Sequence, residues 1–273
     1  MLKKLMKHEW QTGWKIPTIM IAALLVISFF SGLTFAAPIW EQEMGGLEVL
    51  VVLVWMLYYF AVIGLNLAIM LYMAVRFYKS MFTDEGYLTH TLPVTARQLL
   101  LSKILPMAAW VAISTLAVFI SVLIFGGMAL VFLKPANVSL WELMFEGLSM
   151  VELKALLTES GVMSFFGSII CMMVVSVFSG VMMIVGSISM GQMVKGHKVL
   201  GSIGAYFVIN SAISTITSLV MIPLMFKADN GAVMNVFDVL TPVYWIMTLV
   251  SVLITVGLYF LSEFLVRKKL NLD

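Results

Sequence analysis

The chain of 273 residues is 62% hydrophobic and 11% charged, whereas a soluble domain is about half apolar and about a quarter charged. Its net charge of +2 is too small to indicate an anionic partner, and its single cysteine, Cys171, excludes an intrachain disulfide. Six runs of 24 to 35 residues contain no charged residue and no histidine, and about 20 apolar residues suffice for a helix to cross a bilayer. This composition excludes a soluble enzyme, a nucleic-acid-binding domain and a secreted disulfide scaffold, and it predicts an all-α polytopic membrane protein.

The first 15 residues predict an amphipathic helix on the inner leaflet, with lysines on its polar face. Its apolar face carries Leu2, Leu5, Met6 and Trp10. The alternative is an unstructured basic leader. The uncharged run that follows has 25 residues, whereas the apolar region of a signal peptide has about 7–15, so we expect this run to be retained as a first span.

We expect six transmembrane helices that form a single domain over residues 1–273. The predicted spans are about 16–37, 49–75, 104–132, 162–192, 200–225 and 240–262. The segments that then lie on the side of the N-terminus, residues 1–15, 76–103, 195–198 and 263–273, carry 13 of the 16 basic residues. Because basic residues near span ends favour the cytoplasmic side, both termini are predicted to be cytoplasmic.

The fourth uncharged run, with 35 residues, is too long for one simple crossing. It is expected either to kink near Gly180 or Gly186 or to extend toward Lys195. Small residues allow close helix packing, and glycines cluster in spans 4 and 5 at Gly180, Gly186, Gly191, Gly201 and Gly204. These spans are therefore predicted to form a tight antiparallel pair.

The longest outer segment, residues 134–159, contains two capping-box patterns, Ser139 with Glu142 and Ser149 with Glu152. They predict one or two short helices on the outer face. Such helices could shape an exit, or they could simply connect two spans while lying against the membrane.

Three amide side chains, Asn66, Gln192 and Asn210, fall within the predicted spans. Amides can form hydrogen bonds between transmembrane helices and so join them. Alternatively, Asn66 and Asn210 line a path, because polar residues avoid lipid.

The connector between spans 2 and 3, residues 76–103, is longer than a simple turn requires. Thr95 and Gln98 match a capping box and predict a helix that begins at about Ala96. Pro93 ends the structure that precedes it. Twenty-eight patterned residues favour a docking surface over a solvated loop.

No ionisable residue lies well inside a predicted span, which argues against an ion-coupled transporter or a pump that handles its own energy. The stretch Gly191–Lys198, GQMVKGHK, lacks the Lys-Ser/Thr pair that must follow the second glycine of a phosphate-binding loop. The chain is therefore predicted to be no enzyme, to have no ATPase site of its own and to bind no metal or cofactor. An intramembrane enzyme is disfavoured for the same reason.

Residues 76–106 resemble the permease subunits of ABC-2-type transporters. The resemblance is carried by the Asp-Glu-Gly-Tyr stretch at 84–87, the Leu-Pro-Val break at 92–94, the segment 98–103 and Pro106. It implies that the connector is a cytoplasmic coupling region that contacts a separate ATP-binding subunit. The coupling residues it implies are Asp84, Glu85, Gly86, Tyr87, Leu92, Pro93, Val94 and Arg97.

The leading hypothesis is a membrane-spanning subunit of an ATP-driven exporter in the plasma (inner) membrane. It would form the translocation path with a second permease, identical or homologous, and ATP would be bound by the partner subunit. The alternative hypothesis is a non-transport membrane scaffold, sensor or immunity protein in which the same connector is a docking loop.

Overall fold

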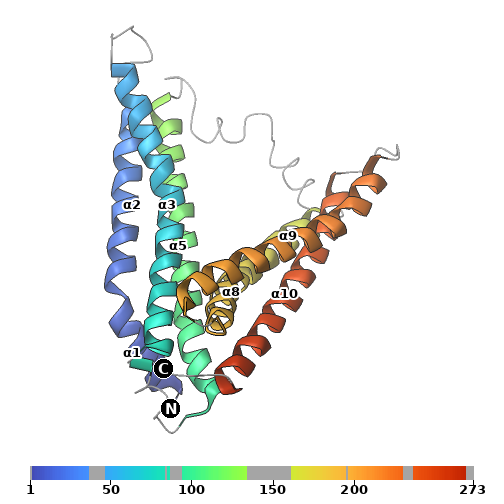
Figure 1. Ribbon diagram of the computed structural model, residues 1–273. Coiled ribbons are helices and arrows are strands. Elements are labelled where there is room, and N and C mark those ends of the chain that lie inside the picture. The colour runs from blue at the N-terminus through green and yellow to red at the C-terminus, as the bar shows by residue number, and fades with distance from the viewer. Residues whose placement is uncertain are drawn as a thin grey trace. The chain divides into compact units, whose positions relative to one another are not determined.

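The computed structural model describes residues 2–36, 47–83, 85–86, 94–133, 161–194, 196–229 and 236–268 (Figure 1). All regular secondary structure in these ranges is helical. The elements are α1 (Leu2–Gly13), α2 (Lys15–Leu33), the 3-10 helix η1 (Thr34–Ala36), α3 (Leu47–Phe82), α5 (Ala96–Leu133), α8 (Val162–Gly191), α9 (Lys198–Asp229) and α10 (Val236–Lys268). The helices predicted for residues 134–159 lie outside the described part of the chain.

Six helices, all except α1 and η1, are long and apolar enough to cross a membrane. The prediction of an all-α protein with six spans is therefore confirmed, and the chain is a multi-pass membrane protein. The helices α3 and α5 continue past the uncharged runs, to Phe82 and from Ala96 respectively. Arginine and lysine are good helix formers, so a charge ends an apolar run without ending its helix.

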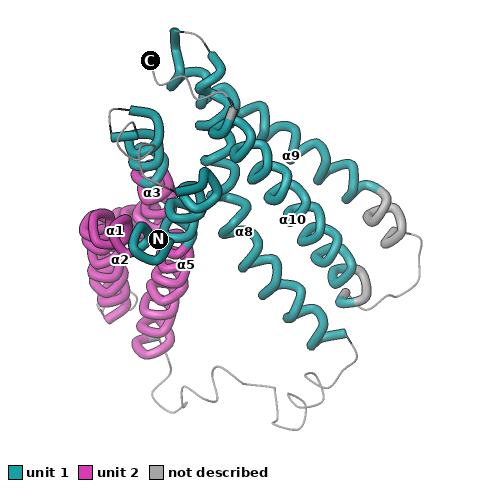
Figure 2. The backbone as a smooth tube through the Cα atoms, turned by 90° about the horizontal axis from the view of Figure 1, so that it is seen from below, with its two compact units in different colours: residues 1–6, 73–108, 153–273 teal, residues 7–72, 109–152 magenta. Residues whose placement is uncertain are grey.

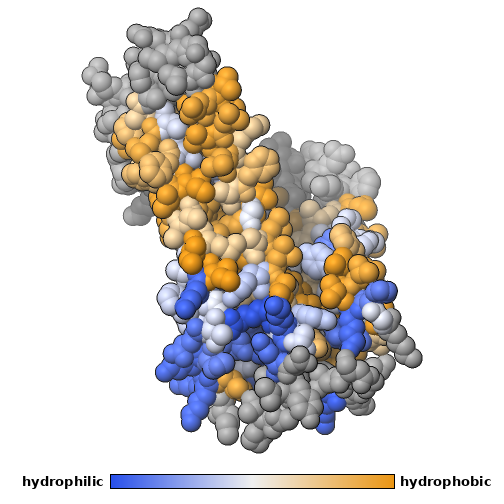
Figure 3. All heavy atoms as spheres, turned by 60° about the vertical axis from the view of Figure 1, so that its left-hand side comes forward, coloured by the Kyte–Doolittle hydropathy of each residue, from blue (hydrophilic) through white to orange (hydrophobic). Residues whose placement is uncertain are grey.

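Hydrophobic side chains cover the flanks of the helices visible in Figure 3, and hydrophilic ones gather toward one end. Large hydrophobic side chains on the spans are widely exposed, such as Phe60, at 71%, and Tyr59, at 69%. Exposed aromatic and aliphatic flanks are what a helix in contact with lipid chains requires.

The chain divides into two compact units, coloured separately in Figure 2. Unit 1 comprises Met1–Met6, Met73–Ala108 and Leu153–Asp273. Unit 2 comprises Lys7–Tyr72 and Ala109–Glu152. The division cuts through α3 and α5, because one part of each helix belongs to each unit.

Unit 2 is held together by aromatic and hydrogen-bonded contacts among α2, α3 and α5. The ring of Tyr58 stacks on that of Phe125 with centroids 4.7 Å apart. The Trp55 indole donates a hydrogen bond to the Thr34 hydroxyl over 2.9 Å. These contacts fix one end of α2 against α3 and α5.

A second polar contact in unit 2 lies further along the same pair of helices. The Ser114 hydroxyl donates a hydrogen bond of 3.0 Å to the amide oxygen of Asn66. Tyr58 contacts Ser121 in the same way, with their oxygen atoms 3.4 Å apart, so α3 and α5 run antiparallel in a fixed register. The interpretation of Asn66 as a residue that joins helices is confirmed.

In unit 1, α8 packs along both α10 and α9. Gly191 lies against Ser202, and Gly201 lies against Val194, so the predicted close packing of spans 4 and 5 is present. Gly186 instead faces Leu258 of α10. The turn between α8 and α9 contains Gly196 with φ +92°, a conformation that side chains other than glycine rarely adopt.

The helix of the fourth run ends at Gly191, so it does not extend toward Lys195. The amides of Met193 and Val194 bond back to the carbonyls of Met190 and Gly191 and close a turn there. The 30 residues of α8 correspond to about 45 Å of helix, which still exceeds the hydrocarbon core of about 30 Å.

Candidate coupling site at the end of α5

One end of α5 extends well beyond the part of the helix that packs in unit 2. Trp10 of α1 stacks on Trp110 of α5, with ring centroids 4.7 Å apart and planes 17° apart. Helix α2, which begins shortly after α1 at Lys15, has 19 residues and is about 28 Å long, which matches the thickness of the hydrocarbon core. The predicted third span begins at about residue 104, so the eight residues of α5 before it add about 12 Å of helix.

The residues of this extension differ from those of the span. The extension carries Arg97, Gln98, Ser102 and Lys103, whereas residues 104–133 contain no charge. Pro106 lies inside α5 and cannot donate the helical hydrogen bond to the Ser102 carbonyl, so it marks the change between the two parts. The extension is thus a polar helical segment joined directly to a transmembrane span.

The structure shows how this extension begins. The backbone amide of Gln98 donates a hydrogen bond to the Thr95 hydroxyl over 3.3 Å, and the amide of Leu99 donates to the Thr95 carbonyl over 3.0 Å. Thr95 is therefore the N-cap, and α5 begins at Ala96. The start of the helix predicted from the capping box is confirmed.

Arg97 connects the extension to the end of α10. Its Nε donates a hydrogen bond to Glu263 Oε1 over 2.6 Å, which also forms an ion pair. The guanidinium is 66% exposed while the carboxylate side chain is only 10% exposed. The arrangement therefore ties two helices together through one buried charge and leaves most of the arginine accessible to a partner.

The end of α3 in the same unit is tightly folded. The Gly86 amide donates a hydrogen bond of 2.7 Å to the Thr83 carbonyl. A Cβ on Gly86 would lie only 2.5 Å from the Met81 carbonyl oxygen, so the turn requires glycine here. Gly86 is thus a structural residue of this turn, whereas the neighbouring Glu85 is exposed.

The structure describes four of the eight predicted coupling residues. Glu85 and Arg97 are exposed, Val94 is partly exposed and Gly86 is buried. Asp84, Tyr87, Leu92 and Pro93 lie outside the described residues.

Sequence reasoning missed Glu263 as the partner of Arg97. Glu263 is the first charged residue after the uncharged run of span 6, and it precedes three basic residues, Arg267, Lys268 and Lys269. An isolated acid in a basic helix end was the available signal. It could not identify Arg97 as the partner, because the pairing depends on how the helices pack.

Comparisons with models of protein families, with curated proteins and with solved structures match this chain to none of them. In the structure, the connector exposes an acid, Glu85, and an arginine, Arg97, and the arginine contacts a second transmembrane helix. Such a surface can receive a protein and pass its motion to two spans.

Proposed function

We propose that this chain is the membrane-spanning subunit of an ATP-driven exporter. Two copies form the translocation path in the plasma membrane, both termini of each copy are cytoplasmic, and separate ATP-binding subunits dock on the connector between α3 and α5. The observation that carries this proposal is the capped polar extension of α5 that is tied to α10 through Arg97 and Glu263.

The extension suits a coupling role because it is continuous with a span. A capped helix resists fraying at its first turn, so a displacement at Ala96 is passed along α5. The ion pair adds α10 to the same movement, and α10 packs along α8. A partner that pushes on one surface would thereby move three spans.

The distribution of charge supports an external source of energy. The six uncharged runs contain no Asp, Glu, Lys, Arg or His that could couple transport to an ion gradient. We assign ATP binding and hydrolysis to the partner subunit, and we assign no catalytic step to this chain. The substrate would pass through an uncharged interior, which is compatible with a lipid, a hydrophobic drug or a peptide.

The proposal is tested by purifying the tagged full-length chain from its native membrane in mild detergent and assaying the complex for ATP hydrolysis. We expect an ATPase to co-purify. Glu85→Arg is expected to weaken the association, because Glu85 is an exposed residue of the connector. Gln11→Arg is the matched control, since it adds a positive charge at an exposed position on α1.

Two outcomes would contradict the proposal. One is a chain that purifies alone and yields no ATP-dependent substrate movement when it is reconstituted in vesicles with ATPase fractions from the same cells. The other is an ATPase complex that Glu85→Arg and Gln11→Arg weaken equally. The first outcome would favour the membrane scaffold or sensor, which needs a docking loop but no transport.

A further inference from the structure

The helix α9 exposes its polar side chains on the face that points away from α8. Ser202 is buried against Gly191 and the Ile188 carbonyl, which fixes the side of α9 that packs on α8. Five polar residues further along the span are exposed and, at about 100° per residue, lie within one half of the helix: Asn210, Ser211, Ser214, Thr215 and Ser218.

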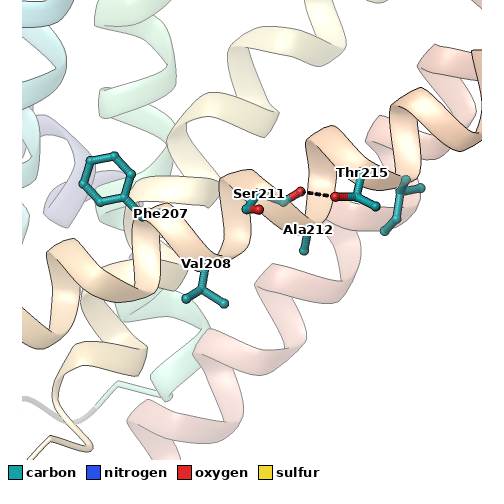
Figure 4. Close-up of a pocket in the computed structure, with 6 residues that line it drawn as sticks. Phe207, Val208, Ser211, Ala212 and Thr215 are labelled. Carbon is teal, nitrogen blue, oxygen red and sulfur yellow. Dashed lines mark hydrogen bonds between the residues drawn. The ribbon is translucent and has the colours of Figure 1, made fainter.

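The surface beside this polar face is hollowed, and the two share Ser211 and Thr215. An open groove of about 640 Å³ follows α9 along Phe207, Val208, Ser211, Ala212, Thr215 and Ile216 (Figure 4). All six lining residues belong to α9, so the groove is one side of a helix that no other described helix of unit 1 covers. Other spans expose large apolar residues, as at Leu116 and Ile170.

The hydroxyl groups of the face are partly satisfied by their own helix, but the amide is not. Thr215 donates to the Ser211 carbonyl over 2.9 Å, and Ser218 donates to the Ser214 carbonyl over 2.9 Å. No hydrogen bond joins the Asn210 side chain to another described residue. An amide that faces lipid without a hydrogen bond is strongly unfavourable, so this face requires a polar cover.

A second copy of the chain meets this requirement by symmetry. Two copies inserted in the same direction are related by a two-fold axis along the membrane normal, so each residue lies at the same depth as its counterpart. A carboxamide both donates and accepts, so two Asn210 amides at one depth can satisfy each other. The serines at 211, 214 and 218 are small enough for two helices to approach closely.

We propose that α9 packs against α9 of a second copy through the face formed by Asn210, Ser211, Ser214 and Ser218, with the two Asn210 amides hydrogen-bonded to each other. This inference rests on the proposed function in one respect, because both require two membrane subunits to pair. It adds which helix makes the contact and which residue sets its register.

Cysteine cross-linking in native membranes tests the contact. In a Cys171→Ser background, single cysteines are placed at Ser211, Ser214 and Ser218, and disulfides are formed with copper phenanthroline. The Cα atoms of two cysteines must approach to about 4.4–6.8 Å for a disulfide to form. We expect a disulfide-linked dimer for at least one of the three and several-fold less for Leu219→Cys, an exposed neighbour that points to another side of α9.

A second measurement tests the amide itself. Asn210→Leu should weaken dimerisation roughly tenfold, through the loss of two interhelical hydrogen bonds, whereas Asn210→Gln should retain most of it. The dimer fraction is measured by single-molecule photobleaching in bilayers. Both variants should elute as single peaks in detergent, because Asn210 makes no contact that stabilises the monomer.

The results separate this inference from the transport proposal. Cross-linking that is absent at all three serines, or equal at Leu219→Cys, overturns the α9 contact even if an ATPase co-purifies. An Asn210→Leu variant that dimerises as well as the original chain overturns the role of the amide. A cross-linked dimer without any ATPase upholds the contact and removes the transport proposal.

Discussion

Arg97 and Glu263 join two helix ends that are 166 positions apart in the sequence, over 2.6 Å. The Glu263 side chain is 10% exposed, and its second oxygen, Oε2, is buried without a hydrogen bond among the described residues. A buried carboxylate with one charged partner is costly to leave alone. This pair therefore determines whether the ends of α5 and α10 stay together.

We predict that Arg97→Ala lowers the free energy of unfolding, because it leaves the buried Glu263 carboxylate without its charged partner. Glu263→Gln should cost less, since it removes the charge together with the need to neutralise it. Both losses can be measured as shifts of the thermal unfolding midpoint in detergent. The folded fraction at each temperature is read by size-exclusion chromatography.

The control for this pair is Arg267→Ala, which removes an exposed arginine on α10 near Glu263 in sequence and should change stability little. The double variant Arg97→Glu with Glu263→Arg should recover part of the loss. If Arg97→Ala and Arg267→Ala have the same effect, the ion pair contributes nothing and the link between α5 and α10 must have another basis.

The stack of Trp10 on Trp110 is predicted to hold α1 against α5. Aromatic pairs contribute about 0.5–1.5 kcal/mol beyond the area they bury, so Trp10→Ala should release α1 while Trp10→Phe should retain most of the contact. Hydrogen exchange of the amides of residues 2–13 measures the release. Trp14→Ala is the control, because no ring contact joins Trp14 to another described residue, and equal exchange in the two alanine variants would contradict the prediction.

The contact of Gly191 with Ser202 is predicted to be essential for the packing of α8 on α9. A Cβ at Gly191 would overlap both the side chain and the backbone of Ser202, so Gly191→Ala should destabilise unit 1 by about 1–3 kcal/mol. Gly167→Ala on the same helix meets nothing within 4 Å and should be neutral or stabilising by up to about 1 kcal/mol. Thermal unfolding of the two variants distinguishes the cases, and equal transitions would show that the contact is not needed.

The features that could be read from the sequence were those determined by neighbouring residues or by the solvent. The six apolar runs identify helices in lipid, and Thr95 with Gln98 identifies a helix start, because each depends on a few consecutive residues. The partners of Trp10 and Arg97 could not be read, because each pairing depends on packing between distant segments. For the same reason the sequence could not distinguish Asn66, which bonds to Ser114, from Asn210, which is exposed.

The cap at Thr95 is predicted to maintain the contact between Arg97 and Glu263, because Arg97 lies in the first turn of α5. Thr95→Ala removes the hydroxyl that accepts from the Gln98 amide and should cost about 1 kcal/mol, whereas Thr95→Ser should preserve the cap. Fraying should accelerate exchange of the Gln98 amide several-fold and should make the effect of Arg97→Ala smaller in the Thr95→Ala background, since the pair would already be loosened. Hydrogen exchange resolved by residue and the double-mutant cycle measure the two effects. Strictly additive losses would show that the cap and the ion pair stabilise the end of α5 independently, so that motion at the start of the helix need not reach α10.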